Sequence, residues 1–446
     1  MAHIAFITNG LTGLLFASFE MVRRLRAHGH HITYWAPELA RDAVIREGLS
    51  FQAIPDFQAK GVTESGMDQI AENLETLSPD LALIDTELPE VVLAAQAARL
   101  QTVLLNTWMS IWQHPGLPPL HRSIQPGVGW HGSSIGVNLA WTRHRLTRRM
   151  KHIVRRCWHG RKYRVTRLRA YSNKIGFPHT KEFDFDNWLL PFSFRSLPIL
   201  TLHAHELDFP HTPRDHVHYV GPMVNPNRQE SPSHATDLAI VEAVLSRRQS
   251  SNTRLIYGGF GSHFVADDRL LSALFSAFAE QREWELIAPL GDRVSSIDVS
   301  KKPANIHLVK WAPQLALLRH ADAAIIHGGI NTIDECIHYK TPMLACSGGM
   351  TDMPGNIARV VHHRLGLSYD VHRDSPETVT NSLDRVMTDP DIKGSLKAQQ
   401  SAAERYAKDK VLECIIDRFL EGDLTSSAGV LTLSRSASPQ AAASRL

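Results

Sequence analysis

Four polar side chains at short spacing stand where a helix is predicted to begin in the last third of the chain. An apolar run at 323–326 leads into His327 and two glycines, then Asn331, Thr332 and, one helical turn later, Glu335. Unpaired N–H groups at a helix N-terminus attract anions, and glycines let the backbone approach them closely. Glu335 lies on the same helix face as Asn331, where a carboxylate suits a ribose diol. The segment therefore predicts a nucleotide diphosphate bound on a strand–turn–helix.

A longer pattern extends on both sides of this segment. Its members are Trp311, Ala312, Pro313, Gln314, His327, Gly329, Asn331, Thr332, Glu335, Asp352 and Asn356. Their spacing resembles the donor signature of the family 1 glycosyltransferases, which use UDP-sugars and have the two-domain GT-B fold. The segment 202–210 resembles the bacterial zeaxanthin and macrolide type of this family more than the plant type, and the resemblance is thin over residues 108–200. An ordinary strand–loop–helix of an α/β sheet is the alternative interpretation.

The resemblance implies a role for each position of the pattern. Trp311 would stack on the uracil ring, beside the Ala312 backbone and Gln314, and Glu335 would bind the ribose. The implied diphosphate contacts are Ser262, His327, Gly329, Asn331 and Thr332. The sugar would lie against Asp352 and Met353. Without the pattern, a tryptophan or a strand-end histidine would more often be a structural residue.

The position of the general base departs from the family pattern. Family members carry a histidine after the first strand, which deprotonates the acceptor hydroxyl, and an aspartate that orients it. Here that position falls on Leu14, after Gly13, whereas Asp85 matches the aspartate. Three explanations stay open: Asp85 is itself the base, the acceptor needs no strong base, or only binding is retained. Gly13 and Leu14 are also candidate acceptor contacts.

The sugar position departs from the family as well. Family members commonly have Asp-Gln, whereas this chain has Asp352 followed by Met353. Methionine cannot donate the hydrogen bonds of an amide, and a missing bond to a sugar hydroxyl changes substrate preference. Glucose is therefore one candidate for the donor sugar, beside N-acetylated and deoxy sugars.

Strands and helices alternate through both halves of the chain. Apolar runs at 3–8, 31–35, 81–84 and 102–106 predict strands, and the second half repeats the pattern from residue 254. This alternation predicts an α/β class with parallel, doubly wound sheets and ligands beyond the carboxyl ends of the strands. With the resemblance, it implies GT-B: two Rossmann-like domains that face a central cleft.

The expected domain organisation follows composition and the resemblance. A segment rich in Asn, Pro and Ser is typical of a linker, and the Ser- and Ala-rich end of the chain predicts a disordered tail. The expected segments are an acceptor domain at 1–224, the linker at 225–235, a donor domain at 236–408, a final helix at 409–422 and the tail at 423–446. By resemblance alone, the final helix crosses back to the first domain.

The middle of the chain has a different character. It contains Trp108 and Trp112, which are candidate acceptor contacts, and a segment at 143–169 that is dense in arginine and lysine with apolar residues between them. Such a basic amphipathic stretch binds anionic membranes, or is a solvated helix face with ordinary burial opposite. Peripheral membrane contact through 143–169 is therefore one hypothesis for a partner.

Length and composition exclude several classes of protein. The 446 residues predict two domains, and a net charge of +3 is too balanced for nucleic-acid binding. Four cysteines without paired spacing and an N-terminus unlike a signal peptide predict a cytoplasmic protein. No apolar run approaches the ~20 residues of a membrane helix. The 25 histidines show no three-ligand zinc pattern, so we expect no metal and no cofactor.

Together with these observations, the resemblance implies a metal-independent, inverting hexosyltransferase. It would move a sugar from a UDP-activated, or dTDP-activated, donor to a small, apolar natural-product or lipid-like acceptor. A sugar-nucleotide epimerase on the same fold and a donor-binding pseudoenzyme that assists a partner transferase are the alternatives. A dehydrogenase is a poor fit, because Gly10 and Gly13 do not complete a G-x-G-x-x-G motif.

Overall fold

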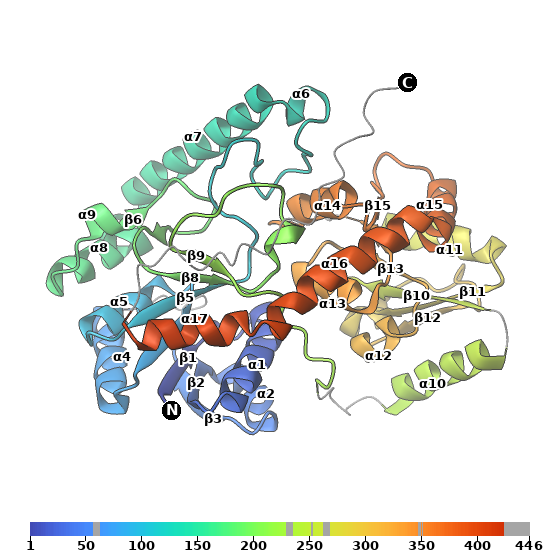
Figure 1. Cartoon of the computed structure of the whole chain (residues 1–446). Coiled ribbons are helices and arrows are strands. Elements are labelled where there is room, and N and C mark those ends of the chain that lie inside the picture. Colours follow the sequence, from blue (N-terminus) through green and yellow to red (C-terminus); the bar gives the residue numbers. More distant parts are fainter. Residues whose placement is uncertain are drawn as a thin grey trace.

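A computed structural model describes residues 1–56, 63–228, 235–250, 253–261, 268–346, 349 and 351–422 (Figure 1). Three expectations therefore fall wholly or partly outside the described residues: Ser262, residues 229–234 of the predicted linker, and the predicted tail at 423–446. The described chain forms two parallel sheets and a short two-stranded one. The predicted α/β class with two parallel sheets is confirmed.

The first sheet contains seven parallel strands in the order β3-β2-β1-β4-β5-β8-β9. They are β1 (His3–Ile7), β2 (His31–Pro37), β3 (Ser50–Ile54), β4 (Leu81–Asp85), β5 (Thr102–Asn106), β8 (Ile199–Thr201) and β9 (Val217–Tyr219). Strand β1 is buried on both faces: Phe6 packs in one hydrophobic cluster and Ala5 in another. This burial explains why the strand sequence is almost continuously apolar.

Helices cover both faces of this sheet. The helical elements of this half are α1 (Thr12–Ala27), η1 (Glu38–Ala40), α2 (Arg41–Arg46), α4 (Glu64–Leu77), α5 (Pro89–Ala97) and η3 (His205–Leu207). Helix α1 packs with Phe6, and α4 and α5 pack with Ala5 on the opposite face. Sheet order reverses between β1 and β4, so the ends of these two strands flank the ligand position typical of doubly wound sheets.

The second sheet contains six parallel strands in the order β12-β11-β10-β13-β14-β15. They are β10 (Arg254–Gly259), β11 (Trp284–Pro289), β12 (Ile306–Val309), β13 (Ala323–Ile326), β14 (Met343–Ala345) and β15 (Gly366–Ser368). The helical elements are α10 (Ala235–Ser250), α11 (Asp268–Glu280), η4 (Gly291–Ser296), α12 (Gln314–Leu318), α13 (Ile330–Tyr339), α14 (Met353–His362) and α15 (Pro376–Thr388). The strand order reverses between β10 and β13, so the residues that follow β13 lie at the ligand position typical of this second sheet.

The middle segment forms a helical region beside the first sheet (Figure 1). Its elements are α6 (Gly129–Gly132), α7 (Ser134–His159), η2 (Gly160–Lys162), α8 (Arg164–Lys174), α9 (His179–Glu182) and the hairpin β6 (Phe183–Asp184) with β7 (Ser193–Phe194). The Ser133 hydroxyl caps α7 by accepting the Gly136 N–H at 3.1 Å. None of the helices in the described ranges has the length and apolar character needed to cross a bilayer.

The last two helices connect the two halves of the molecule. Helix α16 (Pro390–Lys408) runs from the second sheet towards the first, and α17 (Val411–Leu420) lies across the first half (Figure 1). Leu412 and Ile416 of α17 pack in the same cluster as α1. Glu413 accepts two hydrogen bonds from Arg24 of α1, at 2.9 and 2.7 Å. These contacts hold the final helix against the first half of the chain.

Candidate active site

Strand β13 is fully buried and ends at Ile326, and His327 follows it directly. The Nδ1–H of the His327 imidazole donates to the Gly259 carbonyl at 2.9 Å, and burial lowers the pKa of the ring. A Cβ added at Gly261 or Gly329 would lie 2.7 or 2.6 Å from this ring, and Gly261 has φ +70°. Only glycine fits at these two places, so the predicted glycine turns leave room for the imidazole at the edge of the sheet.

The N-terminus of α13 points towards the first half of the chain. Gly329 stands at the N-cap and the helix end has no side-chain cap, so its first N–H groups suit an anion. The Asn331 amide donates to the Gly13 carbonyl, and Thr332 is buried next to Gln314. The predicted phosphate-binding and acceptor loops are thereby in direct contact across the two halves.

Glu335 is buried one turn into α13. Its carboxylate accepts hydrogen bonds from Arg228 Nη1 at 2.8 Å and from the Gln314 amide, which in turn accepts from the Tyr257 hydroxyl. Burial raises the pKa of Glu335, and the Arg228 charge opposes the rise. The Arg228 guanidinium also lies 4.5 Å over the Phe16 ring. Each oxygen of the Glu335 carboxylate therefore has a hydrogen-bond partner within the chain.

The predicted base-stacking residues lie next to this cluster. Trp311 is half-buried, and its backbone N–H donates to Asp237 of α10 at 3.1 Å. Ala312 is buried, and Gln314 begins α12, which contacts α13. The structure thus brings the predicted base, ribose and phosphate residues together at one end of α13.

Asp352 and Met353 stand at the start of α14. Asp352 is buried, with its pKa raised by that burial, and accepts a hydrogen bond from the Asn356 amide at 2.6 Å. The same amide donates to the Gly328 carbonyl at 3.0 Å, so Asn356 ties the start of α14 to the glycine turn after β13. Met353 is half-buried as the first residue of the helix.

Two carboxyl groups lie close together after β4. Asp85 is 2% exposed, and its Oδ1 and Oδ2 accept backbone N–H groups of Glu87 and Asn9 at 2.9 and 3.3 Å. Glu87 is half-buried, and its carboxylate accepts the Asn9 amide at 2.8 Å. Sequence reasoning singled out Asp85 and missed Glu87. The two acids at i and i+2 after a predicted strand were the available signal.

Both carboxyl groups of this pair have a raised pKa, and the rise is large for Asp85. Burial, then the charge of Glu87, raises the pKa of Asp85 well above its ordinary value. Burial also raises the pKa of Glu87, where the Asn9 and Arg164 side chains oppose the rise and the Asp352 charge adds to it. The first proton lost by the pair therefore leaves a charge on Glu87, the more exposed group.

The remaining predicted acceptor residues lie in different surroundings. Leu14 is 5% exposed and packs in the hydrophobic cluster beneath α1. The Trp108 ring is half-buried, 4.7 Å from the ring of Trp188. Trp112 is 2% exposed and donates its indole N–H to Asp184 at 3.2 Å, so its ring belongs to the packing of the middle segment.

Two buried ion pairs cross between the halves near the site. Arg359 of α14 donates to Asp208 through Nε at 2.8 Å and Nη2 at 2.5 Å, and Asp208 also accepts the Ser110 N–H. His203 donates to the Thr107 carbonyl at 2.7 Å and lies 2.6 Å from Asp334 of α13. Burial would lower the pKa of His203, but the Asp334 carboxylate raises it. Sequence analysis identified neither pair.

One group of side chains in the described ranges has the composition of a metal site. It consists of His28, His30 and Asp417, whose ligand atoms lie within 4.8 Å of one another. The group belongs to the contact between the α1–β2 connection and α17, where His28 and Asp417 are 2.9 Å apart. It contains none of the predicted site residues and lies outside the candidate active site.

Comparison with known proteins agrees with this geometry. Residues 295–401 match the family model described as UDP-glucoronosyl and UDP-glucosyl transferase. The oleandomycin glycosyltransferase of Streptomyces antibioticus is 26% identical over 77% of this chain and 74% of its own length. The demethyllactenocin mycarosyltransferase of Streptomyces fradiae is 23% identical over 94% and 87%. The crystal structure of the kitacinnamycin glycotransferase shares the fold, with TM-score 0.66, 19% identity, and coverage of 94% of this chain and 98% of that one.

Proposed function

We propose that this chain transfers, with inversion, a hexosyl group from a UDP- or dTDP-activated donor to a small, apolar natural-product acceptor, since residues 295–401 match the UDP-glucoronosyl and UDP-glucosyl transferase family model. The observation that carries the proposal is the uncapped N-terminus of α13 between His327 and Glu335. Oleandomycin and demethyllactenocin appear in the names of two relatives of similar length, which favours a macrolide-like acceptor.

The chemistry assigned to each half follows from its groups. The diphosphate leaves with increasing negative charge, which the α13 N-terminus and the Asn331 amide would stabilise. These groups provide positive partial charge from the protein itself, so we propose that turnover needs no metal and survives chelation. On the opposite side, a carboxylate of the Asp85–Glu87 pair would accept the proton of the acceptor hydroxyl as the glycosidic bond forms.

We assign the base to Glu87 and a positioning role to Asp85. The base must be ionised and must reach the acceptor, and Glu87 is the more exposed and the more readily ionised member of the pair. Asp85 has both oxygens directed at backbone N–H groups, which fixes the loop that presents Glu87. This assignment replaces Asp85, the base favoured by the sequence alone, and accounts for a leucine at position 14.

Donor binding is expected to depend on Trp311 and Glu335. Trp311→Ala removes a stacking surface and Glu335→Ala a charge-assisted hydrogen bond, so each should weaken UDP by about 1–3 kcal/mol. Isothermal calorimetry with UDP measures both effects. Trp158→Ala, at an exposed tryptophan outside the site, is the matched control and should bind normally. Unchanged affinity in both folded site variants would show that the nucleotide lies elsewhere.

Donor choice is expected to depend on Met353. Met353→Gln supplies an amide at the start of α14, so the ratio of kcat/KM for UDP-glucose to that for the best native donor should rise by about tenfold, the value of one added hydrogen bond. Competition assays with paired donors give this ratio directly. Met150→Gln, at an exposed methionine of α7, should leave it unchanged. A constant ratio in Met353→Gln would mean that this side chain does not face the sugar.

A single assay separates the proposed function from its alternatives. Purified protein is incubated with a set of UDP- and dTDP-sugars and an acceptor library, with and without EDTA, and the products are identified by mass spectrometry. A glycoside formed in both conditions supports the proposal. An epimerised donor without acceptor indicates the epimerase, and binding without any turnover indicates the pseudoenzyme.

A further inference from the structure

Within the described ranges, the buried side chains of helix α7 lie along one face. Trp141 is buried and donates its indole N–H to the Leu117 carbonyl at 2.7 Å. Arg148 is also buried, and its guanidinium donates to the carbonyls of Asn187, Leu189 and Pro191. These bonds fix the orientation of α7, and no part of the chain that the structure describes covers the apolar side chains on the opposite face of the helix.

That opposite face is apolar. Five of its side chains are between 50% and 68% exposed: Ile135, Leu139, Leu146, Met150 and Ile153. Their spacing of four, seven, four and three residues places them in one stripe along the helix. Trp130 and Trp158 are exposed at its two ends, at 62% and 83%. Exposed single apolar residues are ordinary, but a continuous stripe on a protruding helix marks an interaction surface.

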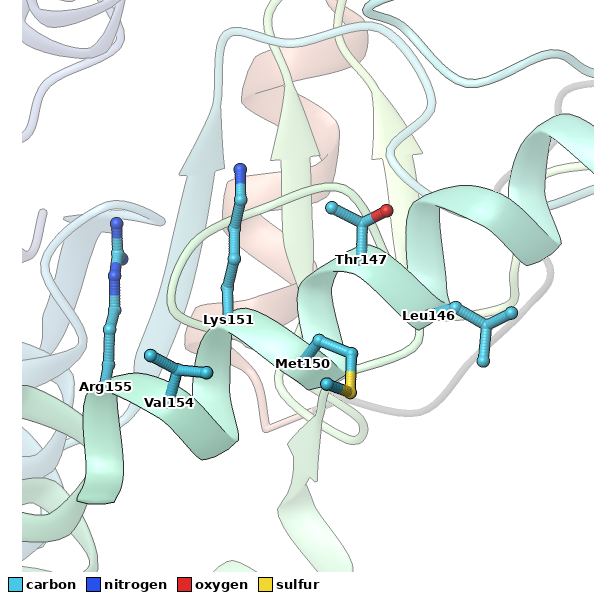
Figure 2. Close-up of a pocket in the computed structure, with 6 residues that line it drawn as sticks. All are labelled: Leu146, Thr147, Met150, Lys151, Val154 and Arg155. Atoms are coloured by element: carbon cyan, nitrogen blue, oxygen red, sulfur yellow. The ribbon is translucent and has the colours of Figure 1, made fainter. Parts of the chain in front are cut away.

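Basic residues border the stripe on both sides. At 100° per residue, Arg143 and Lys151 lie on one side and Arg149 and Arg156 on the other. Figure 2 shows Lys151 and Arg155 extending to the same side of α7, while Leu146 and Met150 point elsewhere, around a surface pocket formed by this helix alone. Within the described part of the chain, only Arg149 of the four pairs with an acid, Asp186 at 3.4 Å.

The charged side chains of α7 and of the residues next to it in the sequence are all basic. No aspartate or glutamate occurs between Glu90 and Glu182, a stretch that includes α7 and α8. The surface around α7 is therefore strongly basic, although the net charge of the whole chain is only +3. A second copy of the same helix would meet it with like charge, which disfavours self-association through this face.

We propose that α7 docks flat on an anionic phospholipid bilayer. The helix is about 39 Å long at 1.5 Å per residue, so it lies in the interface plane with its stripe among the upper acyl chains. The basic flanks contact the headgroup phosphates, and Trp130 and Trp158 occupy the level that tryptophan favours in membranes. The inference rests on α7 alone and does not depend on the proposed transferase activity.

Vesicle co-sedimentation tests the proposal. The full chain is mixed with sucrose-loaded vesicles of phosphatidylcholine alone or with 30 mol% phosphatidylglycerol, at about 0.1 M salt. Binding is expected to the anionic vesicles and to fall steeply with added salt, because screening weakens surface charge attraction. Equal binding to both vesicle types, or to neither, would overturn the proposal.

Two variants separate the contributions of the apolar stripe and the basic flanks. The triple change Leu146→Ser, Met150→Ser and Ile153→Ser should lower the vesicle partition coefficient about tenfold or more. Lys151→Glu with Arg156→Glu should lower it about tenfold or more by charge reversal. Because all five side chains are exposed, both variants should keep the melting temperature of the parent chain.

Matched changes elsewhere on the surface act as controls. The exposed apolar control is Leu39→Ser, Ile45→Ser and Val299→Ser, and the charge control is Lys301→Glu with Lys397→Glu. Both controls should sediment with vesicles as the parent does. Loss of binding in the controls as well as in the α7 variants would assign the effect to general surface properties. A dimer that dissociates in the apolar α7 variant, without vesicle binding by the parent, would assign the face to a second copy; either result overturns the proposal.

Discussion

Glu87→Gln should lower kcat by about 10²–10⁴-fold, the usual contribution of a general base, and leave UDP affinity unchanged. Glutamine keeps the size of the side chain and a carbonyl oxygen that can accept the Asn9 amide, whereas it cannot accept a proton. Because the group is half-buried and its bond to Asn9 persists, the fold should survive. Single-turnover kinetics and calorimetry on the same preparation separate chemistry from binding.

The pH dependence provides a second measure of the same role. The base acts when ionised, and the pKa of Glu87 is raised above its ordinary value of 4.5, largely by burial. Activity should therefore fall as pH decreases through this raised pKa, and the acid limb of kcat/KM should disappear in Glu87→Gln. Glu72→Gln, an exposed acid of α4, is the control and should retain the full profile. Full turnover in Glu87→Gln would contradict the assignment and favour an acceptor that needs no base.

Asp85→Asn distinguishes a base from a positioning group. If Asp85 only orders the loop, its loss should reduce kcat less than Glu87→Gln does. The acid limb should stay near the pH of the parent, because Asp85 has the more strongly raised pKa and is already neutral where Glu87 ionises. A larger loss in Asp85→Asn than in Glu87→Gln, with the acid limb absent from the residual activity, would restore Asp85 as the base.

Arg359→Leu should destabilise the protein by about 3–5 kcal/mol, because it leaves the Asp208 carboxylate buried without its counter-charge. Arg359 is 1% exposed, and its guanidinium also donates to the Gly355 carbonyl and lies 4.5 Å over the Phe209 ring. The pair joins α14 to the first half, so its loss should loosen the contact that aligns the two halves. Urea unfolding monitored by tryptophan fluorescence measures the change.

An exposed ion pair offers the matched control. Arg364 and Asp391 are 3.6 Å apart and both largely exposed, so Arg364→Leu should change stability little. Burial would raise the pKa of Asp208, but Arg359 holds it below the ordinary value of 3.8. The stabilisation from Asp208 should thus be complete above pH ~4 and fade as pH falls through that lowered pKa. Equal effects of the Arg359 and Arg364 changes would contradict a structural role for the buried pair.

The sequence alone determined the class of fold and the kind of donor site. Continuous apolar runs such as 323–326 specify buried parallel strands, since both faces of a doubly wound sheet are covered. The residues around Glu335 were identifiable because a helix start, its glycines and its first-turn polar groups are neighbours in sequence. Local patterns are sufficient wherever the interacting atoms belong to one strand–turn–helix.

Only the tertiary structure decided which distant side chains meet. Asp208 and Arg359 are 151 residues apart, so no spacing rule relates them. The same limit applies to Glu87, whose partner Asn9 comes from another strand end, and whose role depends on being less buried than Asp85. Composition gave α7 its basic character, but whether its apolar stripe faced the core or the solvent was settled by the burial of Trp141 and Arg148 on the opposite side. Burial and pairing are properties of the packed chain, because the free energy of a charge or an apolar surface depends on what surrounds it in space.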